Sequence, residues 1–256
     1  MGWGVFTTLR VYDGKPFAFD RHWARMAHDA VRLGMSLGHE QAGVCRSVSE
    51  LSEANNRPEA TARVSFVKNH GGLWADAKDS PETDLLIFTR QLVQWPAVHR
   101  LKLQPHALYS ATRLAGAKML SWVQNAGLLE RAHSEGFDDV LLLNENGHLA
   151  ECTSANIFLI RGNLVLTPPL ASGCLPGVTR DVLREVVPQA GFELREQDLT
   201  PDDLTSASEV FISSTTREVA AVGSIDAQWR FDAPGKITTT IEASFREYVR
   251  NLLRSG

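Results

Sequence analysis

The sequence predicts a two-domain protein that mixes α-helices and β-strands, with a small α+β domain in residues 1–105 and a larger domain in residues 113–256. In the small domain, stretches with apolar residues at every second position and stretches with helical spacing follow one another as strand, strand, helix, helix and further strands. This order is typical of a compact α+β unit. Residues 106–112 show no clear periodicity, so we interpret them as the connection between the domains.

The first predicted strand covers residues 4–12, where apolar and polar residues alternate. Because successive side chains of a strand point to opposite faces, Phe6, Thr8 and Arg10 share one face. The Asp-Gly pair that follows is typical of a hairpin turn, and a short returning strand comes after it.

Two amphipathic helices and further strands complete the predicted small domain. The helices cover residues 21–35, with Asp20 as the N-cap, and a second stretch through Val44, Val48 and Leu51. The strands cover residues 61–68, 84–90 and 100–104, and a Gly71-Gly72 turn follows the first of them. His22 and His28 have no Cys or His at metal-ligand spacing, so we interpret them as surface or capping groups.

Arg63 lies in the strand of residues 61–68, on the face opposite Val64 and Phe66. A guanidinium on that face is suited to binding an anion such as a phosphate. A surface ion pair explains the same position equally well, so the strand alone leaves both interpretations open.

Lys118 is the candidate nucleophile of the sequence. Its neighbours are small or apolar on both sides, in the stretch Leu-Ala-Gly-Ala-Lys-Met-Leu of residues 114–120. Desolvation disfavours the ammonium form, so an amine in such surroundings is a usable nucleophile near neutral pH. The alternative is a lysine at a helix start whose stem covers apolar surface while its amine reaches water.

The larger domain is predicted to begin with a helix over residues 118–134 and to end with a helix over residues 239–253. The strands between them are expected at residues 140–143, 149–152, 154–160 and 164–167, with two more within residues 208–223.

Residues 175–180, with the sequence Leu-Pro-Gly-Val-Thr-Arg, lead into a predicted helix. Gly177 allows the backbone to approach a ligand closely, and the free N–H groups of a helix start together with the Thr179 hydroxyl suit a phosphate. The hydroxyls of Ser-Ser-Thr-Thr at residues 213–216 could face an anion in the same way. A loop-to-helix start of this kind is also common as a purely structural feature.

Composition and charge exclude several classes of protein. A formal net charge of −4 and a pI near 6.1 argue against a nucleic-acid surface, which usually has a basic excess. No stretch approaches the roughly 18 consecutive apolar residues of a membrane span, and no signal peptide precedes the first strand, so we expect a cytoplasmic protein. Cys45, Cys152 and Cys174 form no CxxC pair, which favours reduced thiols over disulfides or zinc.

Five segments together resemble the fold-type IV pyridoxal-phosphate enzymes, also called class IV aminotransferases. They follow in the family's order over nearly the whole chain: residues 4–14 with 20–25, 115–118, 150–158, 175–180 and 211–216. The resemblance implies a D-amino-acid transaminase-like fold, whose larger domain holds a mixed sheet or barrel flanked by helices. It also implies pyridoxal 5'-phosphate as the cofactor and a homodimer.

The resemblance implies a role for each matching residue. Lys118 would carry the cofactor as a Schiff base and move a proton at the substrate α-carbon. Glu151 would keep a proton on the pyridine nitrogen, which makes the ring a better electron sink. The phosphate group of the cofactor would be bound by Arg63, Gly177, Val178, Thr179, Ser214 and Thr215.

The opening strand also points to a reaction. Phe6, Thr8 and Arg10 would face the substrate, a small amine with a carboxylate, and Phe-Thr-Thr-x-Arg-Val resembles the 4-amino-4-deoxychorismate lyases. These enzymes release pyruvate and 4-aminobenzoate, a folate precursor; in this interpretation Lys118 removes the α-proton and the Thr8 hydroxyl assists proton delivery. The alternatives are a branched-chain or D-amino-acid transaminase, and a cofactor-binding protein without turnover.

Three features depart from the family pattern or leave a choice open. Arg113, near the predicted domain junction, either binds a substrate carboxylate or is a surface arginine. Trp122 stands where many relatives have a Tyr that contacts the cofactor, so no hydroxyl contact is expected there. Relatives also have a strand and turn before the Gly-Val-Phe stretch, so either the true start lies upstream or one edge of the small domain is missing.

Overall fold

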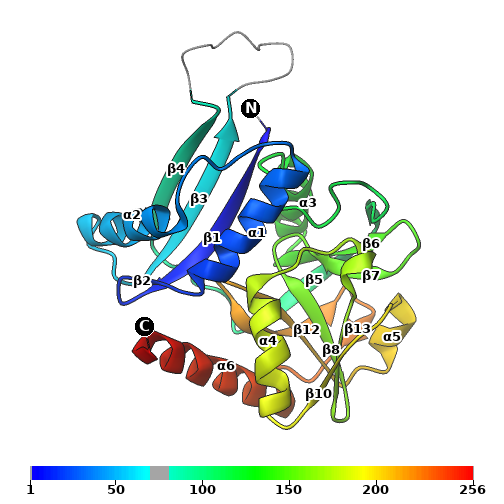
Figure 1. Cartoon of the computed structure of the whole chain (residues 1–256). Helices are drawn as coiled ribbons and strands as arrows, with labels where there is room; N and C mark the ends of the chain where they lie inside the picture. The colour runs from blue at the N-terminus through cyan, green and yellow to red at the C-terminus, as the bar shows by residue number, and fades with distance from the viewer. Residues whose placement is uncertain (1, 70–80, 256) are drawn as a thin grey trace. The chain divides into compact units, whose positions relative to one another are not determined.

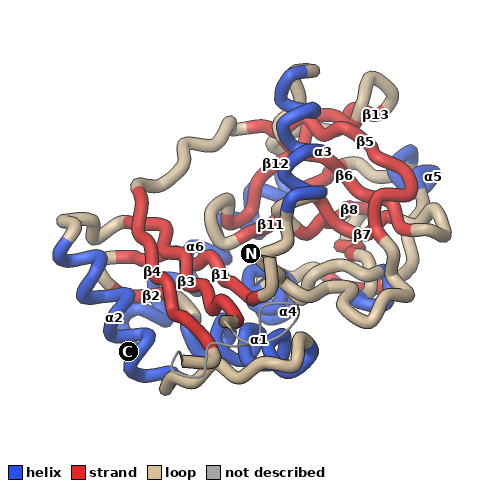
Figure 2. Tube along the Cα trace, turned by 90° about the horizontal axis from the view of Figure 1, so that it is seen from above, coloured by secondary structure: helices blue, strands red, loops and turns tan. Residues whose placement is uncertain are grey.

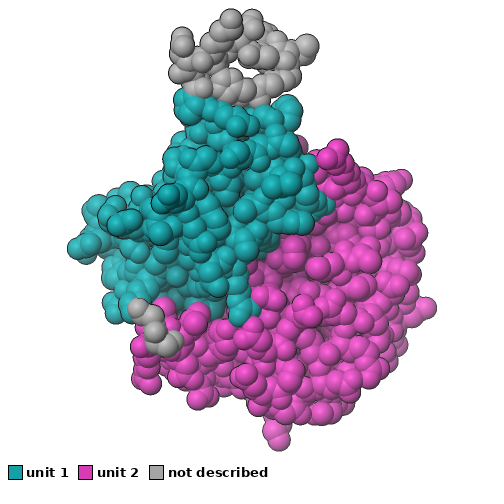
Figure 3. All heavy atoms as spheres, viewed as in Figure 1, with its two compact units in different colours: residues 1–94, 117–122 teal, residues 95–116, 123–256 magenta. Residues whose placement is uncertain are grey.

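The computed structural model describes residues 2–69 and 81–255, so the Gly71-Gly72 turn lies outside the described residues. The chain divides into two compact units, shown in Figure 3. Unit 1 comprises Met1–Gln94 with Ala117–Trp122, and unit 2 comprises Trp95–Gly116 with Val123–Gly256. The chain therefore leaves unit 2 after Gly116, contributes a short segment to unit 1 and returns.

Unit 1 contains an antiparallel sheet with the strand order β2-β1-β3-β4, covered on one face by helices α1 and α2 (Figure 1). Figure 2 shows β1, β3 and β4 side by side. The elements are β1 (Gly4–Tyr12), β2 (Lys15–Pro16), α1 (Phe19–Arg32), α2 (Gln41–Ala54), β3 (Ala60–Lys68) and β4 (Thr83–Arg90).

The alternation predicted for the first strand sets the two faces of this sheet. Val5, Leu9 and Val11 are buried in the core that β1 shares with both helices. On the opposite face, the register pairs Phe6 with Ser65, and Thr8 with Arg63. The residues predicted to face a substrate therefore lie on the face that the helices leave uncovered.

Unit 2 contains a mixed sheet with the order β10-β9-β8-β11-β12-β5-β6-β7, and β13 pairs with β12. Its strands are β5 (Val98–Leu108), β6 (Asp139–Asn144), β7 (Leu149–Cys152), β8 (Asn156–Arg161), β9 (Leu164–Thr167), β10 (Glu193–Glu196), β11 (Glu209–Ser214), β12 (Glu218–Ile225) and β13 (Trp229–Arg230). Its helices are α3 (Val123–Ser134), α4 (Val178–Gln189), α5 (Pro201–Thr205), α6 (Lys236–Ser255) and the short 3-10 helix η2 (Leu170–Ser172).

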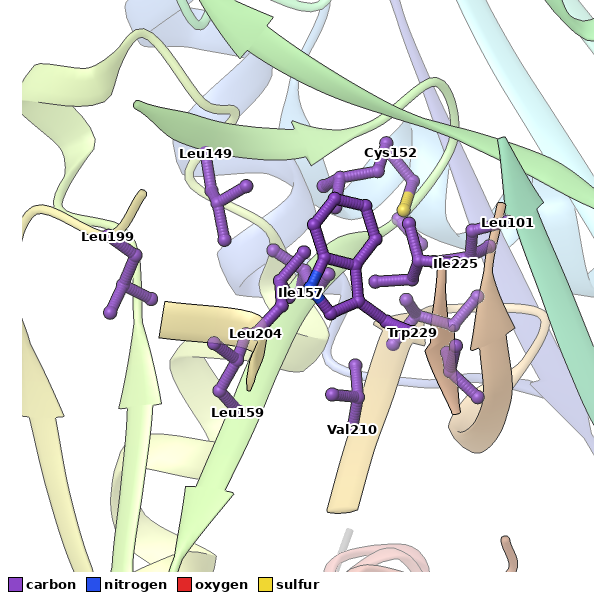
Figure 4. Packing of buried hydrophobic residues seen from close by; sticks show 14 of the residues in the cluster. Leu101, Leu149, Cys152, Ile157, Leu159, Leu199, Leu204, Val210, Ile225 and Trp229 are labelled. Atoms are coloured by element: carbon purple, nitrogen blue, oxygen red, sulfur yellow. The ribbon is translucent and has the colours of Figure 1, made fainter. Parts of the chain in front are cut away.

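The core of unit 2 lies on one face of this curled sheet, where the Trp229 indole packs among Ile157, Leu204 and Val210 (Figure 4). Burial of apolar surface on this scale is the main stabilising contribution to such a unit. On the other face, the Phe158 and Phe211 rings stack with centroids 4.6 Å apart, and α4 and α6 pack against β11 and β12. The predicted mixed sheet flanked by helices is confirmed.

Three predictions differ from the observed elements. Asp20, expected as the N-cap of the first helix, lies in the first turn of α1, whose N-cap is Ala18. The helix expected over residues 118–134 begins only at Val123, because the preceding residues extend along a strand of unit 1. The strand expected at 100–104 is part of β5, which pairs in parallel with β12 and β6 and so belongs to unit 2. The units consequently divide between Gln94 and Trp95, whereas the sequence indicated a connection at 106–112.

Candidate active site

The backbone of Lys118 is fixed by hydrogen bonds to β1 and α1. Lys118 O accepts from Phe6 N at 3.1 Å, and Leu120 N donates to Gly4 O at 2.9 Å. These bonds add residues 118–120 to the edge of the sheet as an antiparallel bridge, with Val5 opposite Met119. Lys118 N donates to Asp29 Oδ2 at 3.0 Å. The lysine is therefore held by an ordered sheet edge.

Gly4 permits this pairing. A Cβ at this position would lie 2.2 Å from Phe66 O and 2.6 Å from Leu120 Cδ1. The glycine of the Gly-Val-Phe stretch is thus required by the close approach of the lysine segment and β3 to β1.

The side chain of Lys118 shares the Phe6 face of the sheet. Its Nζ lies 4.7 Å from the centroid of the Phe6 ring, and the Arg63 guanidinium carbon lies 3.9 Å from the same centroid. Phe6 is buried, whereas Arg63 is exposed. The structure therefore brings together the predicted nucleophile, one predicted phosphate ligand and one predicted substrate contact around a single aromatic ring.

The remaining predicted residues of unit 1 extend this face along β1 and its neighbours. Thr8 is half-buried and directly opposite Arg63 in the register. Arg10 forms an ion pair with Glu59 at 3.1 Å, and its guanidinium lies 4.4 Å from the Tyr12 ring centroid. Arg90 on β4 lies in the same row as Arg10 through Thr61. The lysine face thus carries three arginines.

The α1 face that meets β1 carries a row of polar side chains that the sequence did not predict; His22 and Asp29 are buried and Arg25 is half-buried. Thr7 Oγ1 lies 2.7 Å from His22 Nδ1, and Arg25 Nη2 donates to Thr7 Oγ1 at 2.8 Å. With Asp29, these α1 residues follow the spacing i, i+3 and i+7 of one helical face. This spacing, opposite a threonine on the core face of a strand, was the sequence signal that could have predicted the row. The interpretation of His22 as a surface or capping group was wrong, because its side chain is buried.

Burial and charge determine the protonation of this row. Burial, followed by the charges of Arg25 and Lys118, holds the pKa of His22 well below its usual value. The imidazole is therefore neutral, and one of its two ring nitrogens, Nδ1, shares a hydrogen bond with Thr7 Oγ1. Burial raises the pKa of Asp29, and the Lys118 N–H and the Arg25 charge oppose that shift.

In unit 2, Glu151 and Asn156 hold the loop that precedes α4. Leu175 N donates to Glu151 Oε2 at 3.0 Å, and Asn156 Nδ2 donates to Leu175 O at 2.9 Å. Glu151 is half-buried at the position predicted to meet a pyridine nitrogen. The loop is thus fixed at both its N–H and its carbonyl group.

The predicted phosphate residues Gly177, Val178 and Thr179 lie at the start of α4. Gly177 is the N-cap, and no described side chain caps the N–H groups of Val178 and Thr179. A Cβ at Gly177 would lie 2.1 Å from Asn156 Oδ1, so a larger residue there would require the Asn156 side chain to move. Uncapped N–H groups at the start of a three-turn helix are suited to a dianionic phosphate.

A second polar turn, residues 214–216, lies between β11 and β12. Ser213 pairs with Asn156 across the β11–β8 ladder, which relates this turn to the α4 loop. The Ser213 hydroxyl is buried and has no hydrogen-bond partner among the described residues. Ser214 and Thr215 are half-buried, and Ser214 Oγ accepts from Arg217 N at 3.2 Å. The predicted phosphate residues of unit 2 therefore lie on adjoining loops.

The chemistry of these groups fits pyridoxal 5'-phosphate. Unit 1 supplies an amine with guanidinium groups nearby, and unit 2 supplies a carboxylate, uncapped helix N–H groups and hydroxyls. The thiols of unit 2 do not compete with the amine, because burial raises the pKa of Cys152 far above its usual value and that of Cys174 to about 11. Arg113 is exposed in unit 2, and Trp122 belongs to the lysine segment of unit 1.

Comparison with known proteins decides the family. The profile of the amino-transferase class IV family matches residues 4–225. This chain belongs to the class IV aminotransferase family. It is accordingly an enzyme with the fold of the fold-type IV pyridoxal-phosphate enzymes, as the opening resemblance indicated.

Individual class IV relatives align along most of their length. The chain is 27% identical to a D-alanine aminotransferase of Bacillus licheniformis over 97% of the chain and 88% of the relative. It is 28% identical to a branched-chain-amino-acid aminotransferase of Escherichia coli over 95% of the chain and 83% of the relative.

Solved class IV structures share the fold. A branched-chain amino acid aminotransferase of Escherichia coli superposes with a TM-score of 0.87 and 25% identity, over 97% of this chain and 86% of that one. A putative 4-amino-4-deoxychorismate lyase of Legionella pneumophila gives a TM-score of 0.88 and 24% identity, over 96% of this chain and 91% of that one.

The described residues add two negative findings. In residues 2–69 and 81–255, no group of His, Cys, Asp and Glu is arranged to hold a metal ion. Among the same residues, every helix is too short or too polar to cross a membrane.

Proposed function

We propose that this class IV enzyme binds pyridoxal 5'-phosphate through the Lys118 amine and acts on a primary amine that carries carboxylate groups. The observation that carries the proposal is the placement of Lys118 Nζ over the Phe6 ring, beside Arg63, on a backbone fixed by β1 and Asp29. When bound, the cofactor supplies an electron sink that stabilises negative charge at the substrate α-carbon.

Each residue then has a separate task. Lys118 Nζ accepts and returns the proton at the α-carbon, because it is the amine on the Phe6 face. Glu151, held in place by Leu175 N, keeps the pyridine nitrogen protonated. The N–H groups of Val178 and Thr179 after Gly177, together with Ser214 and Thr215, bind the phosphate.

An arginine completes the phosphate site in this proposal, and unit 1 offers two. Arg63 lies on the Phe6 face with Lys118, whereas Arg25 lies on the α1 face and shares with Lys118 an electrostatic effect on His22. Replacing each by Met separates them: the ligand is the arginine whose loss weakens binding of pyridoxal 5'-phosphate more than binding of pyridoxal.

Among class IV reactions we propose the lyase that converts 4-amino-4-deoxychorismate to 4-aminobenzoate and pyruvate, a step towards folate. The support is Thr8, whose register places it beside Arg63 on the lysine face and two residues from Phe6. There its hydroxyl delivers a proton as the enolpyruvyl group leaves and the ring becomes aromatic. Arg10 and Arg90 on this face, with Arg113 as a further candidate, suit a substrate with two carboxylates.

An amino-acid transaminase is the second candidate, favoured by the names of the aligned relatives from Bacillus licheniformis and Escherichia coli. The two reactions differ in their need for an acceptor. The lyase releases pyruvate from 4-amino-4-deoxychorismate without any 2-oxo acid, and coupled oxidation of a reduced nicotinamide by lactate dehydrogenase measures that pyruvate.

Two results together would instead establish the transaminase. D-alanine, L-leucine or L-glutamate would convert the enzyme-bound cofactor stoichiometrically to its aminated form, and 4-amino-4-deoxychorismate would give no pyruvate. A Thr8→Val variant serves as a control, because it keeps the size of the side chain and removes the hydroxyl. The lyase proposal expects this variant to lose pyruvate release while it retains the bound cofactor.

We further propose that the enzyme is a homodimer, as its family resemblance implies, and that it is cytoplasmic, as the sequence pattern led us to expect. Light scattering coupled to size-exclusion chromatography tests the oligomeric state; a chain that binds its full complement of cofactor as a monomer contradicts it.

A further inference from the structure

Arg217 follows the polar turn between β11 and β12, and its side chain is buried in unit 2 against Asp139. Arg217 Nη2 lies 3.0 Å from Asp139 Oδ2, and the two side chains are 2% and 0% exposed. Removing two charges from water is costly, and apolar residues of similar volume often stabilise a fold equally well. We therefore expect this buried pair to have a role in fixing the local arrangement of the chain rather than in stabilising the fold.

Asp139, at the start of β6, is the fixed end of the pair. Its Oδ1 accepts from Val140 N at 2.8 Å and from Thr153 Oγ1, and its Oδ2 accepts from Ser154 Oγ at 2.7 Å. Ser154 Oγ in turn accepts from Arg217 Nη1 at 2.9 Å. The carboxylate is thus held by its own strand and by the turn that follows Glu151.

The rest of the guanidinium is also engaged. Arg217 Nε lies 3.3 Å from His99 Nε2, and the guanidinium carbon lies 3.8 Å from the centroid of the Trp95 ring. Burial and then the Arg217 charge lower the pKa of His99, which keeps the imidazole neutral and Nε2 available as an acceptor. The guanidinium plane is consequently fixed in both position and orientation.

The backbone of Arg217 closes the turn from the other side. Arg217 N donates to Ser214 Oγ, and Glu218, the next residue, has a φ of +58° in the left-handed region. A non-glycine residue there is strained and persists only when its surroundings impose it. The side-chain contacts of Arg217 are such surroundings, because they hold Arg217 in the interior of unit 2 directly before Glu218.

We propose that Arg217 is a positioning residue that fixes the Ser214–Thr216 turn for the cofactor phosphate, with Asp139 and Ser154 as its anchor. The inference rests on the proposed function, since it assigns Ser214 and Thr215 to the phosphate. Arg217 itself uses its guanidinium inside the unit and acts only through the turn. Its loss should therefore weaken recognition of the phosphate group more than recognition of the ring.

The test compares pyridoxal 5'-phosphate with pyridoxal, which lacks the phosphate, in equilibrium dialysis against the apoenzyme. In Arg217→Met, we expect the ratio of the two affinities to fall about tenfold, as for other residues that orient ligands from behind, while pyridoxal affinity changes by less than about twofold. The matched control is Arg161→Met, which breaks a 2.6 Å ion pair with Asp203 elsewhere in unit 2 and should leave the ratio unchanged.

Ser154→Ala provides a milder variant if Arg217→Met does not fold. It removes the hydroxyl between Arg217 and Asp139 but leaves their direct contact, so a fall of about threefold in the ratio is expected. An unchanged ratio in the folded variants overturns the proposal, and so does an equal loss for both ligands, which indicates a purely structural role. A wild-type enzyme with no preference for the phosphorylated ligand overturns the assignment of the phosphate site itself.

Discussion

The two units hold their proposed catalytic groups in different ways. Unit 1 holds Lys118 through its backbone: residues 118–120 pair with the edge of β1, and the Lys118 N–H donates to Asp29. Unit 2 holds Glu151 and the polar turns through side chains, which bind loop backbone or one another around Asp139 and Arg217.

The difference follows from what each group does. A nucleophile needs a backbone that is fixed in position, whereas a cofactor cradle needs fixed N–H groups and hydroxyls. Substitutions in unit 1 should therefore affect covalent chemistry, and substitutions in unit 2 should affect cofactor affinity and electronics.

Replacing Lys118 by Ala gives the largest expected effect. Loss of the amine removes both the covalent attachment and the proton carrier, so turnover should fall by at least about a thousandfold. Mass spectrometry after borohydride treatment measures the attachment. Lys68→Ala is the matched control, because Lys68 Nζ donates to Gly34 O elsewhere in unit 1. Attachment and turnover that survive in Lys118→Ala would refute the site.

Replacing Glu151 by Gln tests unit 2 without removing an acceptor. The amide oxygen can still accept from Leu175 N, but the negative charge beside the pyridine nitrogen is lost. We expect kcat to fall by about a hundredfold, as when one electrostatic group of an active site is removed, with cofactor affinity nearly retained. A normal kcat in Glu151→Gln would show that the ring nitrogen does not depend on this carboxylate.

Replacing Asp29 by Ala tests the backbone anchor of Lys118. With no acceptor for its N–H, the lysine segment should shift and turnover should fall about tenfold, as for small misplacements of reacting groups. The Lys118 amide should also exchange its hydrogen faster in the apoenzyme. Asp29→Asn is the conservative variant: its amide oxygen can replace Oδ2, so most of the activity and of the protection should return.

The pH dependence of stability should report the buried imidazole of His22. The folded pKa is held below the unfolded value of 6.5, so below pH 6.5 the unfolded chain takes up a proton that the folded chain excludes. The free energy of unfolding should then decrease by about 1.4 kcal/mol per pH unit from this group as pH falls towards the folded pKa.

Denaturant unfolding between pH 7.5 and 5 measures that slope. In His22→Asn the side-chain amide can form a hydrogen bond with Thr7 Oγ1 in either direction but does not titrate, so the slope should be smaller. Equal slopes in both proteins would mean that His22 is not the group responsible.

Local patterns predicted most elements, and pairing between distant segments accounts for what they missed. The alternation around Phe6 and Thr8 defined both faces of β1, because burial of one face enforces a period of two. The lysine segment was predicted as helix because Leu120 and Val123 fit helical spacing, yet the backbone of Gly4 and Phe6 pairs with it as an extended chain. Nothing local to residues 118–120 encodes that partner.

The buried polar groups were harder to predict than the apolar core. Arg217 was one of many charged residues near a turn, and its burial depends on Asp139, Ser154 and His99, which come from three other parts of the chain. Each of these polar side chains can be buried only because the others form hydrogen bonds or an ion pair with it, and this pairing arises only in the folded chain. By contrast, the helix start at Gly177 and Thr179 was predicted correctly, because a loop entering a helix has a local signature.

The return of residues 117–122 to unit 1 has a consequence for dissecting the enzyme. A fragment ending at Gln94 would lack Lys118, the proposed nucleophile, and the complementary fragment would contain it without β1, which pairs with its backbone. Cutting the polypeptide between Gln94 and Trp95 therefore separates Lys118 from the sheet edge that holds its backbone. Exchanging unit 1 with that of another enzyme requires residues 117–122 to be exchanged together with the sheet.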